Sequence, residues 1–166
     1  MERGMDDWDG FYTLAGSTAG TLIGLIFVVI TLGIDHTKKG DEYRVRLFVT
    51  PVLVYFAGLL VIAMVMVPPL SSAWRAFALG AIGSAGLAYV MNLWMLSLRT
   101  MRFEGPRIIW HVVVPLACFA LITTAATAFA LEAPFANALC ALGVVILLVT
   151  SVRNTWMVTL GIASRP

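Results

Sequence analysis

The fold is decided by one long uncharged stretch near the start of the chain, residues 11–34, which reads FYTLAGSTAGTLIGLIFVVITLGI. It contains no Asp, Glu, Lys or Arg. An α-helix crosses the hydrocarbon core of a bilayer, about 30 Å thick, with about 20 mostly apolar residues. Because this stretch meets that length, we expect it to form a transmembrane helix.

Four further apolar runs follow, and the five runs together take up most of the 166 residues. The chain is 60% hydrophobic and 12% charged, with a mean hydropathy of +0.93, whereas a soluble domain is about a quarter charged. The sequence therefore predicts an all-α integral membrane protein, with a single membrane domain over residues 1–166. Residues 154–163 are apolar but too short for another crossing, and we expect them to lie along the inner interface. The five transmembrane helices are expected at about residues 11–34, 47–67, 76–98, 108–131 and 135–152.

Positive residues cluster in alternate gaps between these runs, and this bias predicts the orientation of the chain. Basic residues near the ends of spans stay on the cytoplasmic side. Nine of the eleven Lys and Arg residues fall in the first gap, in the third gap or after the last run, and only Arg3 and Arg75 fall on the other side. All five Trp residues, which prefer the headgroup level, lie close to a predicted boundary. We therefore expect the N-terminus outside, the C-terminus in the cytoplasm, and a multi-pass protein of the bacterial plasma (inner) membrane.

Two stripes of small residues are the main candidate functional features. Small side chains let helix backbones approach closely in lipid, where apolar area alone gives no drive to associate. One interpretation is therefore helix packing, either between these two spans, which run in the same direction, or between subunits. The first run carries the stripe at Thr13, Gly16, Ser17, Gly20, Thr21 and Gly24, and the third run carries it at Ala76, Gly80, Ser84, Ala88 and Asn92.

A second interpretation is that the first helix lines a pore. Its glycines would let identical helices crowd around an axis, and its small, polar face covers the outer half of the span. The inner half, residues 25–30, is wholly apolar and includes Val29. A ring of such side chains is expected to form a hydrophobic constriction that gates by dewetting.

Other classes of site find little support in the sequence. The predicted spans hold no acidic residue that could carry protons, and the chain has no recognisable catalytic motif, so we expect no enzyme activity. His111 lies near the inner interface, where it is either an ordinary interfacial histidine or a pH sensor. The histidines and acids lack the spacing of a metal site, so neither metal nor cofactor is expected. No basic stripe interleaved with aromatic residues predicts nucleic-acid binding.

The first span resembles those of small uncharacterised bacterial polytopic membrane proteins. The resemblance rests on WDGFYTLAGS at residues 8–17 and GTLIGLIFVV at residues 20–29, and covers about the first 35 residues. It implies a polytopic membrane fold and no assigned chemistry. Five-span translocator-type proteins look similar in length, but their Trp- and Pro-rich first loop is missing. Small multidrug exporters rely on a Glu in the first span, which this chain lacks.

The functional expectation is a homo-oligomer in the lipid bilayer, acting as a passive pore or ion channel lined by the first helix. One alternative is a non-conducting accessory or scaffold subunit that docks another membrane protein through its small-residue faces. Another is a small transporter of a neutral or apolar solute, because such a substrate needs no buried charge.

Overall fold

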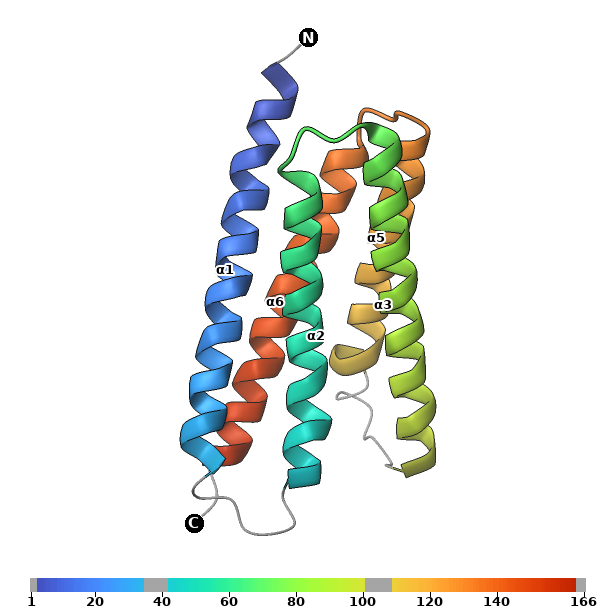
Figure 1. Ribbon diagram of the computed structural model, residues 1–166. Coiled ribbons are helices and arrows are strands. Elements are labelled where there is room, and N and C mark those ends of the chain that lie inside the picture. The colour runs from blue at the N-terminus through green and yellow to red at the C-terminus, as the bar shows by residue number, and fades with distance from the viewer. Residues whose placement is uncertain (1–2, 35–41, 101–108, 164–166) are drawn as a thin grey trace.

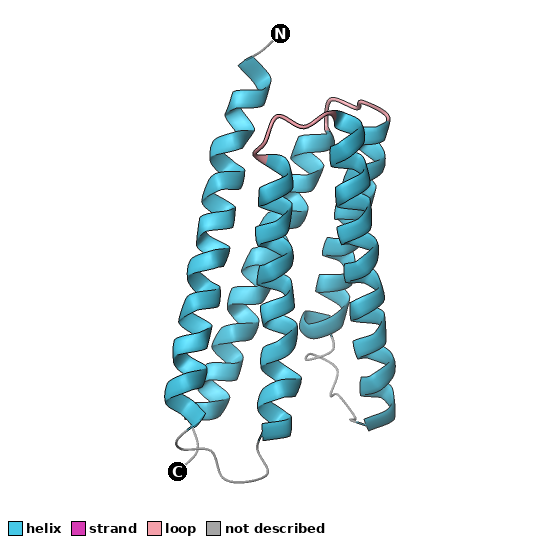
Figure 2. Ribbon diagram, in the orientation of Figure 1, coloured by secondary structure: helices cyan, strands magenta, loops and turns pink. Residues whose placement is uncertain are grey.

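The chain folds into a bundle of long helices, seen here in a computed structural model that describes residues 3–34, 42–100 and 109–163. Figures 1 and 2 show the helices side by side, and all regular structure in the described ranges is helical. In chain order the elements are α1 (Arg3–Ile34), α2 (Glu42–Met66), α3 (Ser72–Thr100), the π-helical turn η1 (Ile109–Val113), α5 (Val114–Ala130) and α6 (Ala136–Ala163).

Three of the described helices are long and apolar enough to cross a membrane. Their apolar stretches are Trp8–Val29 in α1, Ser72–Met95 in α3 and Ala136–Met157 in α6. The apolar parts of α2 and α5 are shorter, Thr50–Met66 and Val114–Ala130. This arrangement agrees with an all-helical membrane protein. That the chain crosses the membrane five times, and in which direction, stays a prediction.

The helices are arranged so that α1 and α3 lie on opposite sides of the bundle (Figure 1). Helix α1 packs along α2 and also contacts α6. Helix α3 packs along α5, which in turn packs against α6, and α2 contacts both α6 and α3. Over the described residues, α1 and α3 do not contact each other. Each of these two helices therefore keeps one face free of the chain's own helices.

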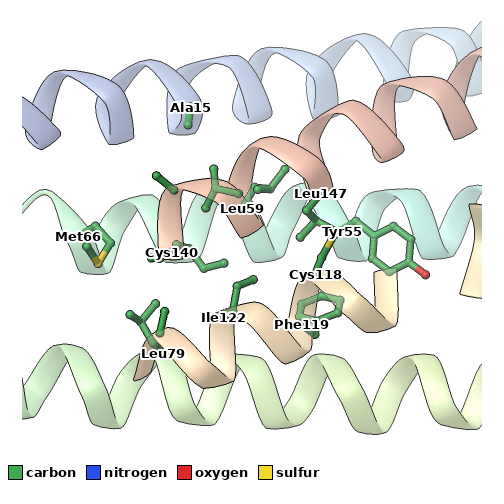
Figure 3. Close-up of a cluster of buried hydrophobic side chains, with 14 of the residues drawn as sticks. Ala15, Tyr55, Leu59, Met66, Leu79, Cys118, Phe119, Ile122, Cys140 and Leu147 are labelled. Carbon is green, nitrogen blue, oxygen red and sulfur yellow. The ribbon is translucent and has the colours of Figure 1, made fainter. Parts of the chain in front are cut away.

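The core lies where α2, α5 and α6 meet. Figure 3 shows Leu59 of α2, Ile122 of α5 and Leu147 of α6 in this region and Phe119 on the side of α5 toward α3, and each is at most 2% exposed. Cys118 and Cys140 are free thiols, both fully buried in the same core. Since lipid is as apolar as these side chains, the core is held mainly by close packing rather than by exclusion of water.

Two short turns close the bundle at the end where α1 begins. Pro68 and Pro69 follow α2. Ser71, the residue before α3, caps that helix: its Oγ accepts a hydrogen bond from the Trp74 N–H at 3.5 Å. After α5, Glu132 adopts a positive φ of 51°. Its neighbour Ala133 donates its N–H to the Ala128 carbonyl at 2.9 Å, which satisfies one of the last carbonyls of α5.

The helix boundaries differ most from the expected spans at the start of α1 and at the end of α6. Helix α1 begins at Arg3, eight residues before the apolar run, because polar residues at the start of a span continue the helix outside the hydrocarbon. Helix α6 continues without a break through Ala163, so residues 154–163 extend the last helix, and their place along the inner interface stays a prediction. No Pro interrupts that stretch, and Arg153 and Asn154 contact η1.

Candidate functional site

The exposed face of α1 carries most of the predicted first stripe. Thr13, Ser17, Thr21, Gly24 and Val29 are all exposed on this helix. The Ser17 hydroxyl donates to the Leu14 carbonyl at 3.0 Å, and the Thr21 hydroxyl donates to the Ser17 carbonyl at 2.9 Å. Because these hydroxyl hydrogens are satisfied within the helix, the face can border water, lipid or another helix at little cost.

The glycines of the stripe do not all serve the same purpose. Gly16 is buried against α2, where a Cβ added to it would lie 2.8 Å from the Ala63 Cβ. It therefore sets the closest approach of α1 to α2. Gly20 and Gly24 would carry a Cβ with no heavy atom within 4 Å, so neither glycine is needed for packing inside the chain. The structure thus divides the predicted stripe between an internal contact and a free face.

The second predicted stripe, on α3, also faces mainly outward. Ala76 and Gly80 are half-buried, and a Cβ on Gly80 would meet the Ala126 Cβ at an ordinary 3.8 Å. Ser84, Ala88 and Asn92 are exposed. The Ser84 hydroxyl donates to the Gly80 carbonyl at 2.7 Å, and the Asn92 amide donates to the Ala88 carbonyl at 2.9 Å. The two stripes do not meet within the chain, because α1 and α3 lie on opposite sides of the bundle.

The glycines that bring α3 close to α5 were not part of the predicted stripe. A Cβ added to Gly83 would meet the Thr123 side chain and lie 3.1 Å from the Thr123 backbone nitrogen. A Cβ added to Gly86 would overlap the ring of Phe119. Gly83 directly precedes Ser84 of the predicted stripe, and Gly86 follows three residues later. This spacing of three between the two glycines was the signal available in the sequence.

At the end of the bundle where α1 begins, Arg75 is buried and only 8% exposed. Its Nη2 donates to the carbonyls of Met66 at 3.3 Å and Pro68 at 3.1 Å, which lie at and just beyond the C-terminus of α2. A cation there also complements the partial negative charge of a helix C-terminus. The Arg75 Nε is buried with no hydrogen-bond partner. Arg75 is therefore held against the C-terminal end of α2.

At the opposite end, α6 is tied to the π-helical turn η1. The Arg153 guanidinium lies 4.1 Å from the centroid of the Trp110 ring, within the range of a cation–π contact. The adjacent Asn154 is 1% exposed and donates its amide to the Trp110 carbonyl at 3.3 Å, while its Oδ1 has no partner. His111 belongs to η1 by its backbone, and its side chain lies outside the described part of the chain.

The described residues bring together no group of three or more His, Cys, Asp or Glu side chains that could hold a metal ion. No protein-family model, no curated protein and no solved structure matches this chain. The functional argument is therefore based on the geometry itself: a peripheral helix with an exposed small-residue face, a second such face on the other side, and a buried arginine at one end.

Proposed function

We propose that this chain is a homo-oligomeric polytopic protein of the bacterial plasma membrane, with α1 lining a passive pore at the centre of the oligomer. The single observation that carries the proposal is the position of α1. It lies at the side of the bundle, where Ser17, Thr21 and Gly24 are exposed. Several copies of such a helix can surround an axis, with hydroxyl groups lining the half nearest the N-terminus.

The gate of the proposed pore is the apolar half of α1. Leu25, Val28 and Val29 are 55%, 54% and 43% exposed, although they belong to a helix that packs against α2 and α6. A ring of these side chains would form a constriction that excludes water and ions unless it widens. The outer hydroxyl face and the inner apolar face thus give the helix a vestibule and a gate.

The proposal includes five crossings, with the N-terminus outside and the C-terminus in the cytoplasm. Helix α2 has 25 residues, and η1 followed by α5 covers residues 109–130, so at 1.5 Å per residue each is about 30 Å long or more. Exposed Trp74 and Trp156 lie at opposite ends of the bundle, as expected for residues at the two headgroup layers. The basic residues of the first and third gaps favour the cytoplasm for the end where α6 finishes.

The orientation is tested by labelling with a thiol reagent that cannot cross the membrane. Ser71→Cys, in the turn before α3, should be labelled in intact cells. Met157→Cys, which is 46% exposed near the end of α6 in the wild type, should be labelled only after the membrane is opened. Cys118 and Cys140 are fully buried, so the wild-type chain serves as the unlabelled control. Labelling of both variants, or only of Met157→Cys, in intact cells would overturn the proposed orientation.

The pore is tested by solute flux in liposomes. Val29→Ser should raise the basal leak, because a hydroxyl in the constriction favours water there. Val145→Ser is the matched control, since Val145 of α6 is 42% exposed and Val29 is 43% exposed, and it should leave the leak unchanged. Equal leak in Val29→Ser, Val145→Ser and the wild type would contradict a gate at Val29.

A second candidate function is favoured by the free face of α3. Ser84, Ala88 and Asn92 are exposed on the side of the bundle opposite to α1 and would suit docking of another membrane protein. A non-conducting accessory subunit would show no flux in liposomes for any of these variants. Substitutions on the exposed face of α1 would also leave the oligomeric state of such a subunit unchanged.

A further inference from the structure

A shallow apolar groove between α1 and α2 lies beside the buried arginine. It has a volume of about 340 Å³ and is lined on α1 by Thr13 and Gly16, on α2 by Leu60, Ala63 and Met64, and in the turn after α2 by Pro68, among others. The groove exists because Gly16 has no side chain and Ala63 has only a methyl group, whereas the larger Leu60 and Met64 side chains line it beside them. Its volume is at the lower end of the range of about 300–1,000 Å³ found for small-molecule sites.

The groove has the direction and the chemistry of a site for an acyl chain. Its lining residues run from Leu60 on α2 to Pro68 in the turn after α2, and from Tyr12 to Gly16 on α1, so it is elongated along the helix axes. The helical part from Leu60 to Met66 is about 9 Å long. In a chain whose helices cross a bilayer, this is also the direction of the lipid tails. The exposed Met64 beside the groove, 63% accessible, leaves it open toward the side of the bundle.

The groove ends at a positive charge for which the described side chains supply no counter-ion. Pro68 lines the groove, and its carbonyl accepts a hydrogen bond from Arg75 Nη2 at 3.1 Å. The structure describes two acidic side chains, Asp9 and Glu132, and neither forms an ion pair with Arg75. Arg75 is more than nine-tenths buried, and its Nε lacks any acceptor. A guanidinium binds phosphate oxygens strongly, through charge-assisted hydrogen bonds.

We propose that a phospholipid of the outer leaflet binds here, with one acyl chain in the groove between α1 and α2 and its phosphate at Arg75. The proposal depends on the membrane placement argued above and not on the pore. The phosphate would supply the missing negative charge, and the acyl chain would cover the apolar groove. Trp74, next to Arg75 and 64% exposed, would lie at the level of the headgroup.

Lipid binding is measured by native mass spectrometry of the purified full-length chain after removal of its lipids. Phosphatidylglycerol, diacylglycerol with the same acyl chains, and glycerol phosphate are added back separately. We expect one phosphatidylglycerol per chain at concentrations at which neither of the other two compounds binds. Equal binding of phosphatidylglycerol and diacylglycerol would overturn the role of the phosphate, and binding of glycerol phosphate alone would overturn the role of the groove.

Matched variants locate the site. Leu60→Trp fills the groove and should weaken phosphatidylglycerol binding about tenfold or more, whereas Val61→Trp, on an exposed position outside the groove, should change it less than about twofold. Arg75→Gln should abolish the preference for phosphatidylglycerol over diacylglycerol, and Arg75→Lys should retain part of it. Equal affinities of Leu60→Trp and Val61→Trp would contradict the proposal. Because binding is counted per chain, a failure of the pore in the liposome assay leaves this result unaffected.

Discussion

At the scale of single residues, the packing of α3 on α5 depends on the absence of side chains at Gly83 and Gly86. We expect Gly86→Ala to lower the free energy of unfolding by about 1–3 kcal/mol, because the new methyl group overlaps the Phe119 ring in a packed core. Gly10→Ala is the control, since a Cβ there meets nothing within 4 Å. Thermal unfolding in detergent measures both, and equal stability of the two variants would contradict the described contact.

Glu132 is a second position at which the backbone determines the effect of substitution. Its φ of 51° is in the left-handed region, which costs a residue with a Cβ about 1–2 kcal/mol and glycine little. We therefore expect Glu132→Gly to raise the free energy of unfolding by about 1 kcal/mol. Glu132→Ala keeps the Cβ and should give no such gain in the same unfolding assay. A gain in both variants would point to the lost carboxylate and not to the backbone.

At the scale of elements, the junction of η1 with α6 explains why the last helix is so long. Pro115 has no N–H, so the Trp110 carbonyl loses the donor that a π-helical register would place five residues further on. The Asn154 amide donates to this carbonyl at 3.3 Å, and Arg153 covers the Trp110 ring. Both contacts require α6 to continue past residue 152, where the apolar run ends.

This junction is tested by a double-mutant cycle. Asn154→Leu should destabilise the protein by about 1–3 kcal/mol, because it leaves the carbonyl of the half-buried Trp110 without the Asn154 donor. In a Pro115→Ala background the restored N–H can take over that carbonyl, so the cost of Asn154→Leu should fall by more than about 0.5 kcal/mol. Additive effects of the two substitutions on the free energy of unfolding would show that Asn154 and Pro115 do not act on the same carbonyl.

The elements themselves were largely predictable, because an apolar run of sufficient length has no good alternative to a helix in lipid. The approximate positions of the helices, such as 47–67 for α2 (Glu42–Met66), follow from that constraint. The start of α1 and the end of α6 were not predictable by hydropathy, since polar residues extend α1 before its apolar run and Arg153 separates residues 154–163 from the last apolar run. The roles of Gly16, Gly83 and Gly86 were also hidden, because a small-residue pattern does not say which neighbouring helix it faces. Arg75 could be placed at a span end, but its hydrogen bonds to the end of α2 depend on the turn at Pro68.

At the scale of the whole molecule, the arrangement leaves the chain with two free faces on opposite sides. Helix α1 shows Ser17 and Thr21 on one side, and α3 shows Ser84 and Asn92 on the other. A ring with α1 toward its axis would place the hydroxyl face inside, as the pore proposal requires.

The mass of the detergent-solubilised particle, with bound detergent subtracted, tests this central claim most directly. The account predicts a discrete species of at least four copies of the 18.0 kDa chain, with their α1 helices around the axis. Gly20→Leu should reduce that mass, because a Cβ at Gly20 meets no atom of the chain within 4 Å and the larger side chain would point into the interface between copies, whereas Val145→Leu should leave the mass unchanged. A wild-type monomer or dimer would contradict a pore lined by α1 and would favour the accessory subunit.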